Sequence, residues 1–528
     1  MVGEGHGTCE ALGSAARRNS PVYRDRHVVK VVLGTRETLP RTAEVVKSGP
    51  ISPKGEVASC RKGVGGGGST EEVRTTKTSW REEPLLCPSK WRRYERVNAE
   101  SANYAKVKAQ ELQNKLYLAA KENPKRRFHA LYDKLYREDV LWEAWRRVKG
   151  NRGSGGIDGM TIDQIVREYG EEQFVEDIRE KLVAGTYHPL PARRKEIPKG
   201  DGKFRPLGIP ALVDRTVQMA TKMVIEPIFE TDFKDFSYGF RPKRDTKGAI
   251  RHIRRAVKQG VYWVVDVDIT GYFDNIPHEK LMMLVEQRIS DRRVLKLIRK
   301  WLKAGFVKDD QFYETDLGSP QGGVISPLLA NIYLNYLDTI WEKKFTELGT
   351  MVRYADDLVI LCKTKEQALR SIDVLKAVFA KLELQMNTSK SKLVNLWDDK
   401  NGFDFLGMHH RKIPKQIKGK EHYILRSYPS KKAMKKMKEK VKEVTEPRNR
   451  LFWTMNEMVK ELNPKIQGWK NYYAMDSFAI PFLNKIDWYI RKRLMLFWNK
   501  KLNRRNKHSQ SNKVGIIAQL AGLKKLIS

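Results

Sequence analysis

The sequence predicts an α+β fold, with helical segments toward both ends of the chain and strands between them. Residues 98–121 and 125–149 are basic and place apolar side chains roughly at helical spacing. The run VYWVVDVDI at residues 261–269 is β-branched and mostly apolar, which predicts a buried strand. Residues 351–362 indicate a strand, a turn and a second strand. The chain of 528 residues is long enough for several domains.

The charge of the chain indicates a polyanionic partner. Lys and Arg number 101 against 63 Asp and Glu, which gives a formal net charge of +38. Residues 411–528 alone contain 30 Lys or Arg and 8 Asp or Glu, a net +22. Nucleic acid is therefore the first candidate partner, and the C-terminal region is expected to carry much of the binding surface.

Several classes of protein are not expected. No uncharged apolar run approaches the roughly 18 residues of a membrane span, and residues 1–10 do not begin a secretory signal, so a cytosolic protein that does not contact membranes is expected. The cysteines are far apart and form no C-x-x-C pair, which favours free thiols over a zinc site; they are Cys9, Cys60, Cys87 and Cys362.

Three further segments are interpreted from local composition. Residues 1–85 have no sustained period and contain four consecutive glycines, so they are expected to be of low order, and the working hypothesis is a dispensable extension. The glycine-rich residues 151–159 lack the order of a nucleotide P-loop and predict a turn. Residues 193–210 predict a hairpin, with a charged strand ending at Ile197 and a second strand broken by Pro206.

Two acidic groups stand in apolar surroundings. Asp266 and Asp268 share one face of the predicted strand, because residues two apart on a strand point the same way. Asp356 and Asp357 lie at the bend of the second element, where an isolated pair is more often a solvated turn or a helix cap. Buried carboxylates are costly unless cations or hydrogen bonds compensate them. If the two elements are neighbours in one sheet, Asp356 and one acid of the first strand converge.

Clustered carboxylates of this kind suit Mg²⁺, a hard cation that prefers oxygen ligands and substrate phosphates. Two such ions, about 3.5 to 4 Å apart, activate a 3′-hydroxyl and stabilise a leaving pyrophosphate. The acids therefore predict phosphoryl-transfer chemistry on nucleotides.

Motifs along the chain resemble those of the reverse transcriptases encoded by group II introns, from about Trp142 to Tyr473. The matching stretches follow in the family's order: FRPLGIPALVDRTVQMA, EPIFE, SYGFRPKR, DVDITGYFDNIPH, GSPQGGVISPLLANIYL, RYADDLVI, LELQMNTSKSK and FDFLG. PSKKAMKKMKEKVKEVT and LNPKIQGWKNYY resemble the family's thumb, or maturase, region. The resemblance implies a right-hand polymerase with fingers, a palm built on an antiparallel sheet, a helical thumb and a helical N-terminal extension.

The resemblance also implies a division of the chain. The expected parts are the N-terminal residues 1–85, a helical extension at 86–170, fingers at 171–260, a palm at 261–410, a thumb or maturase region at 411–500, and a short basic tail at 501–528.

Residue by residue, the resemblance assigns the catalytic, metal-binding carboxylates to Asp268, Asp356 and Asp357, which would hold two Mg²⁺ ions. Asp266 lies outside the match. Phe273 resembles the bulky residue that crowds the 2′ position of an incoming nucleotide; the alternative is an ordinary core phenylalanine.

Further residues are assigned to nucleotide and template. Lys199 and Arg205 resemble the pair that grips the triphosphate, for which a guanidinium fork and a point charge are suited. Gln321 is assigned to the nucleotide. Lys390 is similar to a basic residue that assists the leaving pyrophosphate, and a plain surface lysine is the alternative. Gly322 permits close approach of the template, and Tyr354 is assigned to template and primer binding.

Residues 430–445 predict a basic helix. Ser430 is a plausible N-cap, apolar residues recur at helical spacing, and seven lysines lie between residues 431 and 442. So dense a charge favours a helix that follows phosphates over a merely solvated face. Lys431, Lys435 and Lys438 are the residues assigned to template and primer binding.

The function implied by the resemblance is an RNA-directed DNA polymerase and splicing maturase. It would bind a group II intron RNA, promote its splicing, and copy it from a DNA primer with dNTPs during retrohoming into target DNA. No cysteine follows Cys362, so the family's H-N-H endonuclease is not expected, and Asp245 to Lys247 depart from the family's usual Ser and His. The alternatives are a host-adopted relative in DNA repair or phage defence, and an RNA-binding maturase without polymerase activity.

Overall fold

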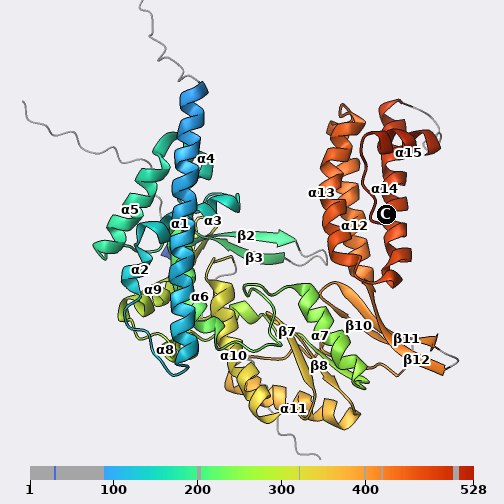
Figure 1. Ribbon diagram of the computed structural model, residues 1–528, viewed down its shortest axis with the longest axis horizontal. Coiled ribbons are helices and arrows are strands. Elements are labelled where there is room, and N and C mark those ends of the chain that lie inside the picture. Colours follow the sequence, from blue (N-terminus) through green and yellow to red (C-terminus); the bar gives the residue numbers. More distant parts are fainter. Residues whose placement is uncertain are drawn as a thin grey trace, which may run out of the picture.

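The computed structural model describes residues 29–30, 88–198, 204–319, 322–397, 400–417, 420–503 and 511–527. Lys199, the predicted turn of the first hairpin, Gln321 and nearly all of residues 1–85 lie outside the described residues. Figure 1 shows the N-terminal helices on one side, the sheets in the middle and a group of C-terminal helices on the other side.

The N-terminal part is helical, as predicted. Its helices are α1 (Pro88–Glu122), α2 (Tyr132–Leu135), α3 (Glu138–Gly150), α4 (Ile162–Gln164), a π-helical turn (Ile165–Tyr169) and α5 (Glu171–Val183). Both α1 and α3 pack against α6 (Leu212–Glu230). Trp145 is fully buried, with its ring centroid 4.7 Å from that of Phe174 on α5.

The prediction of helix from residue 125 onward was wrong for residues 125–131. Phe128 instead forms a strand-like bridge to Ile289 and donates its backbone N–H to Arg288 O at 2.8 Å. The next amides, of Leu131 and Tyr132, both donate to the Asp291 carboxylate. Hydrogen bonds to a distant segment therefore override the local helical pattern, which resumes only at α2.

A five-stranded sheet contains the predicted hairpin. Its strand order is β1 (Val29–Lys30), β6 (Gln311–Tyr313), β5 (Phe306–Lys308), β2 (Ala192–Pro198) and β3 (Phe204–Ile209). The prediction that Pro206 breaks the second strand was wrong, because Pro206 lies inside β3, opposite Glu196. β3 is the outermost strand of the sheet, where proline is tolerated because only one side of the strand has to pair.

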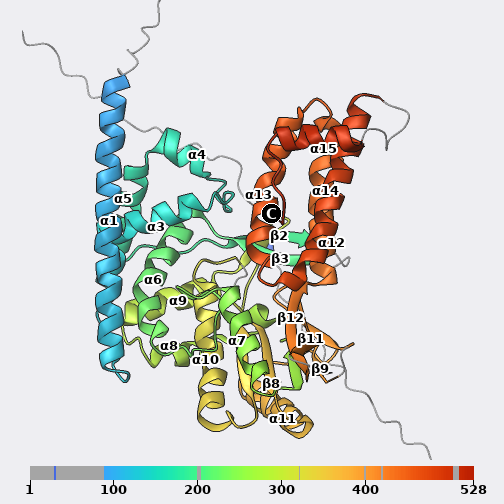
Figure 2. The ribbon, with the colours of Figure 1, turned by 45° about the vertical axis from the view of Figure 1, so that its right-hand side comes forward.

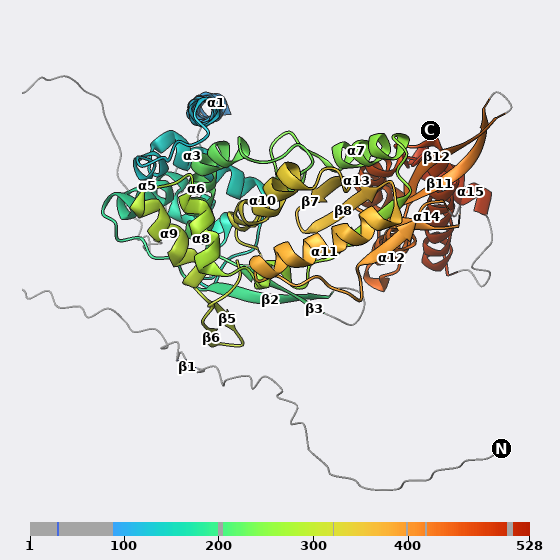
Figure 3. The same ribbon diagram turned by 90° about the horizontal axis from the view of Figure 1, so that it is seen from below.

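A four-stranded antiparallel sheet joins the two acidic segments, in the order β7 (Thr350–Tyr354), β8 (Asp357–Cys362), β4 (Trp263–Val267) and β9 (Lys392–Asn395). Val265 and Val267 face one core with α11 (Lys365–Lys381). Val264 faces a second core with α7 (Thr246–Lys258). Figure 3 shows β7 and β8 between α7 and α11. Covering on both faces explains why β4 is almost continuously apolar.

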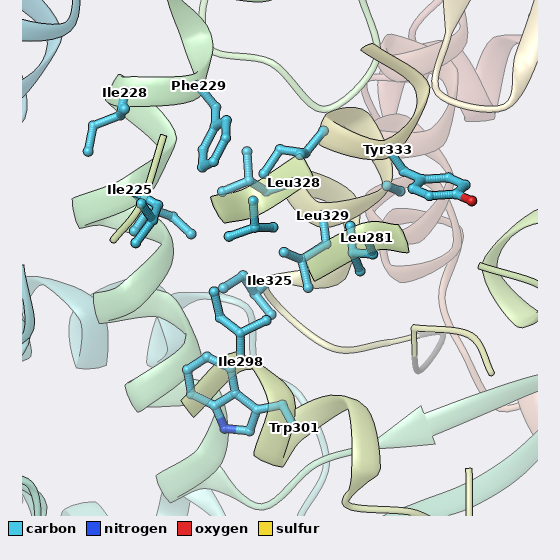
Figure 4. Packing of buried hydrophobic residues seen from close by; sticks show 14 of the residues in the cluster. Ile225, Ile228, Phe229, Leu281, Ile298, Trp301, Ile325, Leu328, Leu329 and Tyr333 are labelled. Atoms are coloured by element: carbon cyan, nitrogen blue, oxygen red, sulfur yellow. The ribbon is translucent and has the colours of Figure 1, made fainter. Parts of the chain in front are cut away.

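The core that β4 shares with α11 is the largest one, called the main core below, and it continues to where three further helices meet α6. They are α8 (His278–Glu286), α9 (Arg292–Lys303) and α10 (Ser326–Lys344). Figure 4 shows Ile225 and Phe229 of α6 facing Leu328 of α10, with Ile298 and Trp301 of α9 beside them. Burying each such side chain contributes about 1.5–3 kcal/mol. The same core includes side chains of α10 and of the four-stranded sheet, among them Leu337 and Met351.

The C-terminal part begins with a three-stranded sheet, β10 (Gly402–Phe405), β11 (Met408–Ile417) and β12 (Lys420–Pro429). Four helices follow: α12 (Lys431–Thr445), α13 (Met455–Tyr473), α14 (Ile480–Lys501) and α15 (Ser511–Leu520). They share a core of their own, which includes Met437, Leu462 and Ile490. Figures 1 and 2 show them as a separate group joined to the remainder through β12.

The predicted cap of the basic helix is confirmed. Ser430 is the N-cap of α12, and its Oγ accepts a hydrogen bond from Ala433 N at 3.2 Å. Short 3₁₀ turns occupy Tyr272–Asp274, Arg448–Arg450 and Ser477–Ala479. Among the described residues, no helix is both long and apolar enough to cross a membrane.

Candidate active site

Sheet pairing brings the acidic segments to one end of the four-stranded sheet. β4 and β8 are antiparallel, with Val267 opposite Leu358, so Asp268 and Asp357 follow as the next residues at the same end. Asp356 occupies the turn between β7 and β8, after Ala355, whose φ is +59°. The sheet therefore places three carboxylates from distant parts of the sequence within electrostatic reach of one another.

Desolvation, and then mutual repulsion, disfavours full ionisation of these acids. Partial desolvation, and then repulsion by Asp356 and Asp268, raise the pKa of Asp357. Water still reaches this side chain and screens part of the repulsion. Burial likewise raises the pKa of Asp356, against the opposing charges of Arg205 and Arg353. A divalent cation would relieve this repulsion, and three carboxylates are the hard oxygen donors that Mg²⁺ prefers. The donor chemistry of these side chains thus suits a divalent metal.

The side chains, as they stand, do not enclose an ion. Within the described ranges, no three carboxylate, imidazole or thiol groups are close enough to hold one metal jointly. Lys390 Nζ instead lies 3.0 Å from Asp268 Oδ2, and Asp268 N donates to Ser391 Oγ at 3.2 Å. The lysine assigned to pyrophosphate is therefore within the acidic site, neutralising one carboxylate.

Asp266, which the motif match left aside, belongs to the same acidic surface. It lies on β4, opposite Val359 of β8 and Lys392 of β9. Burial, followed by the charge of Asp357, raises the pKa of Asp266 to about 7, while Lys392 opposes the shift. Its alternation with Asp268 was the sequence signal for this placement.

The five-stranded sheet contributes a cation to the site. Arg205 of β3 acts electrostatically on both Asp356 and Asp357. Gly322 lies against the same strand: its φ is +112°, and a Cβ at this position would overlap the carbonyl oxygen of Gly208. Glycine is required there because both the backbone conformation and the close approach exclude a side chain.

The surroundings of Phe273 agree both with a residue that crowds the nucleotide sugar and with an ordinary core phenylalanine. It is partly buried, packs against the main core, and its ring contacts that of Tyr272 edge to face, with centroids 5.4 Å apart. Its backbone oxygen accepts a hydrogen bond from Ser319 N at 2.7 Å. The turn that carries Phe273 is thus tied to the segment leading to Gly322, close to the end of β4.

The remaining assigned residues lie on two different elements. Tyr354 ends β7, opposite Asp357, and is half-buried. Lys431, Lys435 and Lys438 are exposed on α12, so the structure does not bring them to the acids. Lys438 Nζ lies 5.7 Å from the ring centroid of Tyr489 on α14.

Sequence reasoning missed one residue of the site, Arg353. Its guanidinium is fully buried and donates to Ala355 O at 2.8 Å, directly before Asp356. The available signal was an arginine inside the otherwise apolar strand that precedes the acidic turn, because buried charges need partners.

Comparisons with known proteins agree with this architecture. Residues 197–410 match the family described as Reverse transcriptase (RNA-dependent DNA polymerase). Residues 434–515 match the family described as Group II intron, maturase-specific domain. The first match covers the whole four-stranded sheet and the acids, and the second covers most of α12–α15.

Three relatives illustrate the similarity. Protein YkfC of Escherichia coli is 36% identical over 361 residues, which cover 61% of this chain and 93% of that protein. Group II intron-encoded protein LtrA of Lactococcus lactis is 41% identical over 222 residues, covering 42% of this chain and 36% of LtrA. The putative COX1/OXI3 intron 2 protein of Saccharomyces cerevisiae is 35% identical over 209 residues, covering 39% of this chain and 24% of that protein. The chain thus spans most of YkfC but well under half of the two intron proteins.

The sheets, the acidic turn and the first family match define an RNA-directed DNA polymerase with the α+β right-hand fold, as predicted. The maturase-specific match lies in the separate C-terminal helices. With YkfC and LtrA as relatives, the chain belongs to the family of group II intron-encoded reverse transcriptases and maturases.

Proposed function

We propose that the protein binds a group II intron RNA, promotes its splicing, and copies it into DNA from a primer at a target DNA site during retrohoming. The observation that carries the polymerase half is the convergence of Asp268, Asp356 and Asp357 beside Arg205. The basic C-terminal helices support the RNA-binding half.

The proposed division of the chain follows the resemblance. The helical extension takes residues 86–170, the fingers 171–260, the palm 261–410 and the thumb 411–500, with a basic tail after residue 500. Residues 1–85 are proposed to be a dispensable extension. No endonuclease is included in the proposal.

In the proposed mechanism, Asp268, Asp356 and Asp357 would hold two Mg²⁺ ions, whose chemistry would be activation of the primer 3′-hydroxyl and stabilisation of the leaving pyrophosphate. Arg205, with Lys199, binds the triphosphate of the incoming dNTP. The contribution of the chain's own residues to the reaction is therefore positioning and charge.

Other residues set selectivity and accommodate the products. Phe273 crowds the 2′ position of the sugar, and Gly322, beside Gln321, lets the template backbone approach. Lys390, which contacts Asp268, is within reach of the site where the pyrophosphate departs. Tyr354 supports the primer end from β7.

For splicing, the exposed lysines of α12 bind phosphates of the folded intron RNA. Because only the folded RNA presents this pattern of phosphates, binding shifts its folding equilibrium by mass action. The RNA itself performs the cleavage.

The test uses the full chain and RNA recovered with it on purification. Extension of a DNA primer on that RNA with Mg²⁺ and dNTPs, together with faster splicing of the RNA, is expected. Splicing without extension would favour the RNA-binding maturase, and co-purification of no intron RNA would favour the host-adopted relative.

Replacing Phe273 with Ala is expected to raise ribonucleotide incorporation about 10- to 100-fold relative to deoxyribonucleotides, because the space over the 2′ position opens. Single-nucleotide insertion with dNTP and rNTP pairs measures the ratio. Phe345→Ala, at a partly buried phenylalanine of the main core, is the control and should leave the ratio unchanged. Equal ratios in both variants would favour the core interpretation of Phe273.

Changing Lys431, Lys435 and Lys438 together to Gln is expected to weaken intron RNA binding and to reduce the slope of log affinity against log salt by about 2 to 3. Filter binding over a salt series measures the slope. A matched triple change at Lys365, Lys376 and Lys381, on α11 of the palm, controls for net charge. A slope that falls equally in both triple variants would remove α12 from the RNA-binding surface.

A further inference from the structure

A buried ion pair lies directly behind the turn that carries Asp356. Arg353 of β7 and Asp338 of α10 both have side chains that are 0% exposed. Arg353 Nε donates to Asp338 Oδ1 at 2.9 Å, and Nη2 donates to Asp338 Oδ2. Desolvation makes a buried ion pair a poor source of stability, so its presence here calls for another account.

The same guanidinium holds the backbone of the turn. Arg353 Nη1 donates to Ala355 O at 2.8 Å and to Asn331 Oδ1 at 3.1 Å. Ala355 directly precedes Asp356 and has a φ of +59°, a left-handed conformation that is unfavourable for alanine. The hydrogen bond from Arg353 therefore stabilises the backbone conformation that presents the carboxylates.

A second link runs from the same cluster to the segment before α7. Asn331 Nδ2 donates to Gly239 O at 2.8 Å, and a Cβ on Gly239 would overlap Ala355 N. Tyr238 N donates to Arg353 O at 2.9 Å. Three segments, α10, residues 237–239 and the acidic turn, are thus joined through one arginine and one asparagine.

We propose that Arg353 is a positioning residue for DNA synthesis, which holds the Asp356–Asp357 turn in register with α10. This inference rests on the proposed polymerase function. α10 begins at Ser326, soon after Gly322, so the link fixes the acids relative to the segment assigned to nucleotide and template. Arg353 touches no substrate, and Asp338 neutralises its charge, so its contribution is geometric.

Only arginine can make this set of contacts. Its planar fork reaches both Asp338 oxygens, Asn331 and Ala355 at once. A lysine at position 353 keeps the charge and can still pair with Asp338. Its single ammonium group cannot at the same time donate to the carbonyl oxygen of Ala355, which the guanidinium reaches through a different nitrogen. Arg353→Lys therefore loosens the turn while keeping the buried charges paired.

The test compares Arg353→Lys with Arg288→Lys in the full chain. Arg288 is also buried, at 4% exposed. Its Nη2 donates to Ala120 O at 3.1 Å, and its Nε lies 3.4 Å from Asp232 Oδ2, so its partners are not those of the acidic turn. Both variants should lower the melting temperature. Only Arg353→Lys should lower kcat for dNTP addition, by about 10- to 100-fold per folded molecule, and raise the Mg²⁺ concentration at half-maximal rate, with intron RNA affinity unchanged.

Asn331→Ala keeps the test decisive should Arg353→Lys fail to fold. It preserves the Arg353–Asp338 pair and removes the links to Asn331 Oδ1 and Gly239 O. The same two changes, in kcat and in the Mg²⁺ midpoint, are expected at a smaller, several-fold size.

Three results overturn the inference: an unchanged kcat and Mg²⁺ midpoint in Arg353→Lys, equal losses in Arg353→Lys and Arg288→Lys, or an unchanged Asn331→Ala where Arg353→Lys does not fold. Failure of the unmodified protein to extend any primer is a different result, which removes the proposed polymerase function and this inference with it.

Discussion

Asp356→Asn is expected to reduce primer extension by about 1000-fold while leaving the protein folded and bound to intron RNA. The amide matches the carboxylate in shape but lacks the charge that attracts a divalent cation. Stabilisation of transition-state charge by such a cation lowers the barrier by several kcal/mol. Single-turnover extension on an RNA template with a DNA primer measures the loss.

The matched control is Asp373→Asn, on an exposed part of α11, which should extend primers at the normal rate. Splicing should persist in Asp356→Asn, because the lysines assigned to RNA lie on α12. Extension that survives in Asp356→Asn would falsify the assignment of this carboxylate to the metal site.

Asp291→Ala is expected to destabilise the protein by about 3 kcal/mol. Asp291 is 4% exposed. Its carboxylate accepts hydrogen bonds from the amides of Leu131 and Tyr132, at 2.9 and 2.8 Å, and from the amides of Arg293 and Val294 at the start of α9. Its removal leaves buried N–H groups unsatisfied in two segments at once. Urea unfolding measures the change.

Asp245→Ala is the control for this second prediction. Asp245 caps α7 through one hydrogen bond, to Gly248 N at 2.7 Å, and does not tie two segments together. A loss of about 1 kcal/mol is expected there. If Asp291→Ala costs no more than Asp245→Ala, the tie to Leu131 and Tyr132 adds nothing to stability.

The effect of Asp291→Ala should also depend on pH. Burial opposes ionisation of Asp291, but the four backbone N–H groups outweigh it, and the pKa of the carboxyl falls below its ordinary value. A depressed pKa in the folded state means that the stability is present above the unfolded pKa, about 3.9, and is lost as pH falls through the folded pKa. The difference in unfolding free energy between the unmodified protein and Asp291→Ala should therefore shrink as pH is lowered from 6 toward 3.

Local sequence was sufficient for elements whose neighbours agree with their pattern. The β-branched run became β4, the acidic turn lies between β7 and β8, and Ser430 caps α12. Each depends on short-range rules, namely alternation, turn chemistry and capping. The convergence of Asp268 with Asp357 required one further assumption, that β4 and β8 are neighbours, and the register bears this out.

Local sequence was insufficient where distant partners decide the conformation. Residues 125–131 read as helix, but the carbonyl and amide groups of the segment after α8 draw them into strand-like pairing. The contacts of Arg353 could not be predicted either, because Asp338, Asn331 and Ala355 meet only in the folded chain. Asp266 was left aside because it lies outside the matched motif. The charges that surround it, of Asp357 and Lys392, come from distant parts of the sequence.

Pro206 has a consequence for how the protein avoids unwanted self-association. The outer edge of a sheet offers free N–H and C=O groups that can template pairing with another chain and start aggregation. β3 is such an edge, and Pro206 has no N–H to offer a further strand, while Arg205 adds charge beside it. The proline and the charge together make this edge a poor template for a further strand, which is one way in which native proteins limit aggregation.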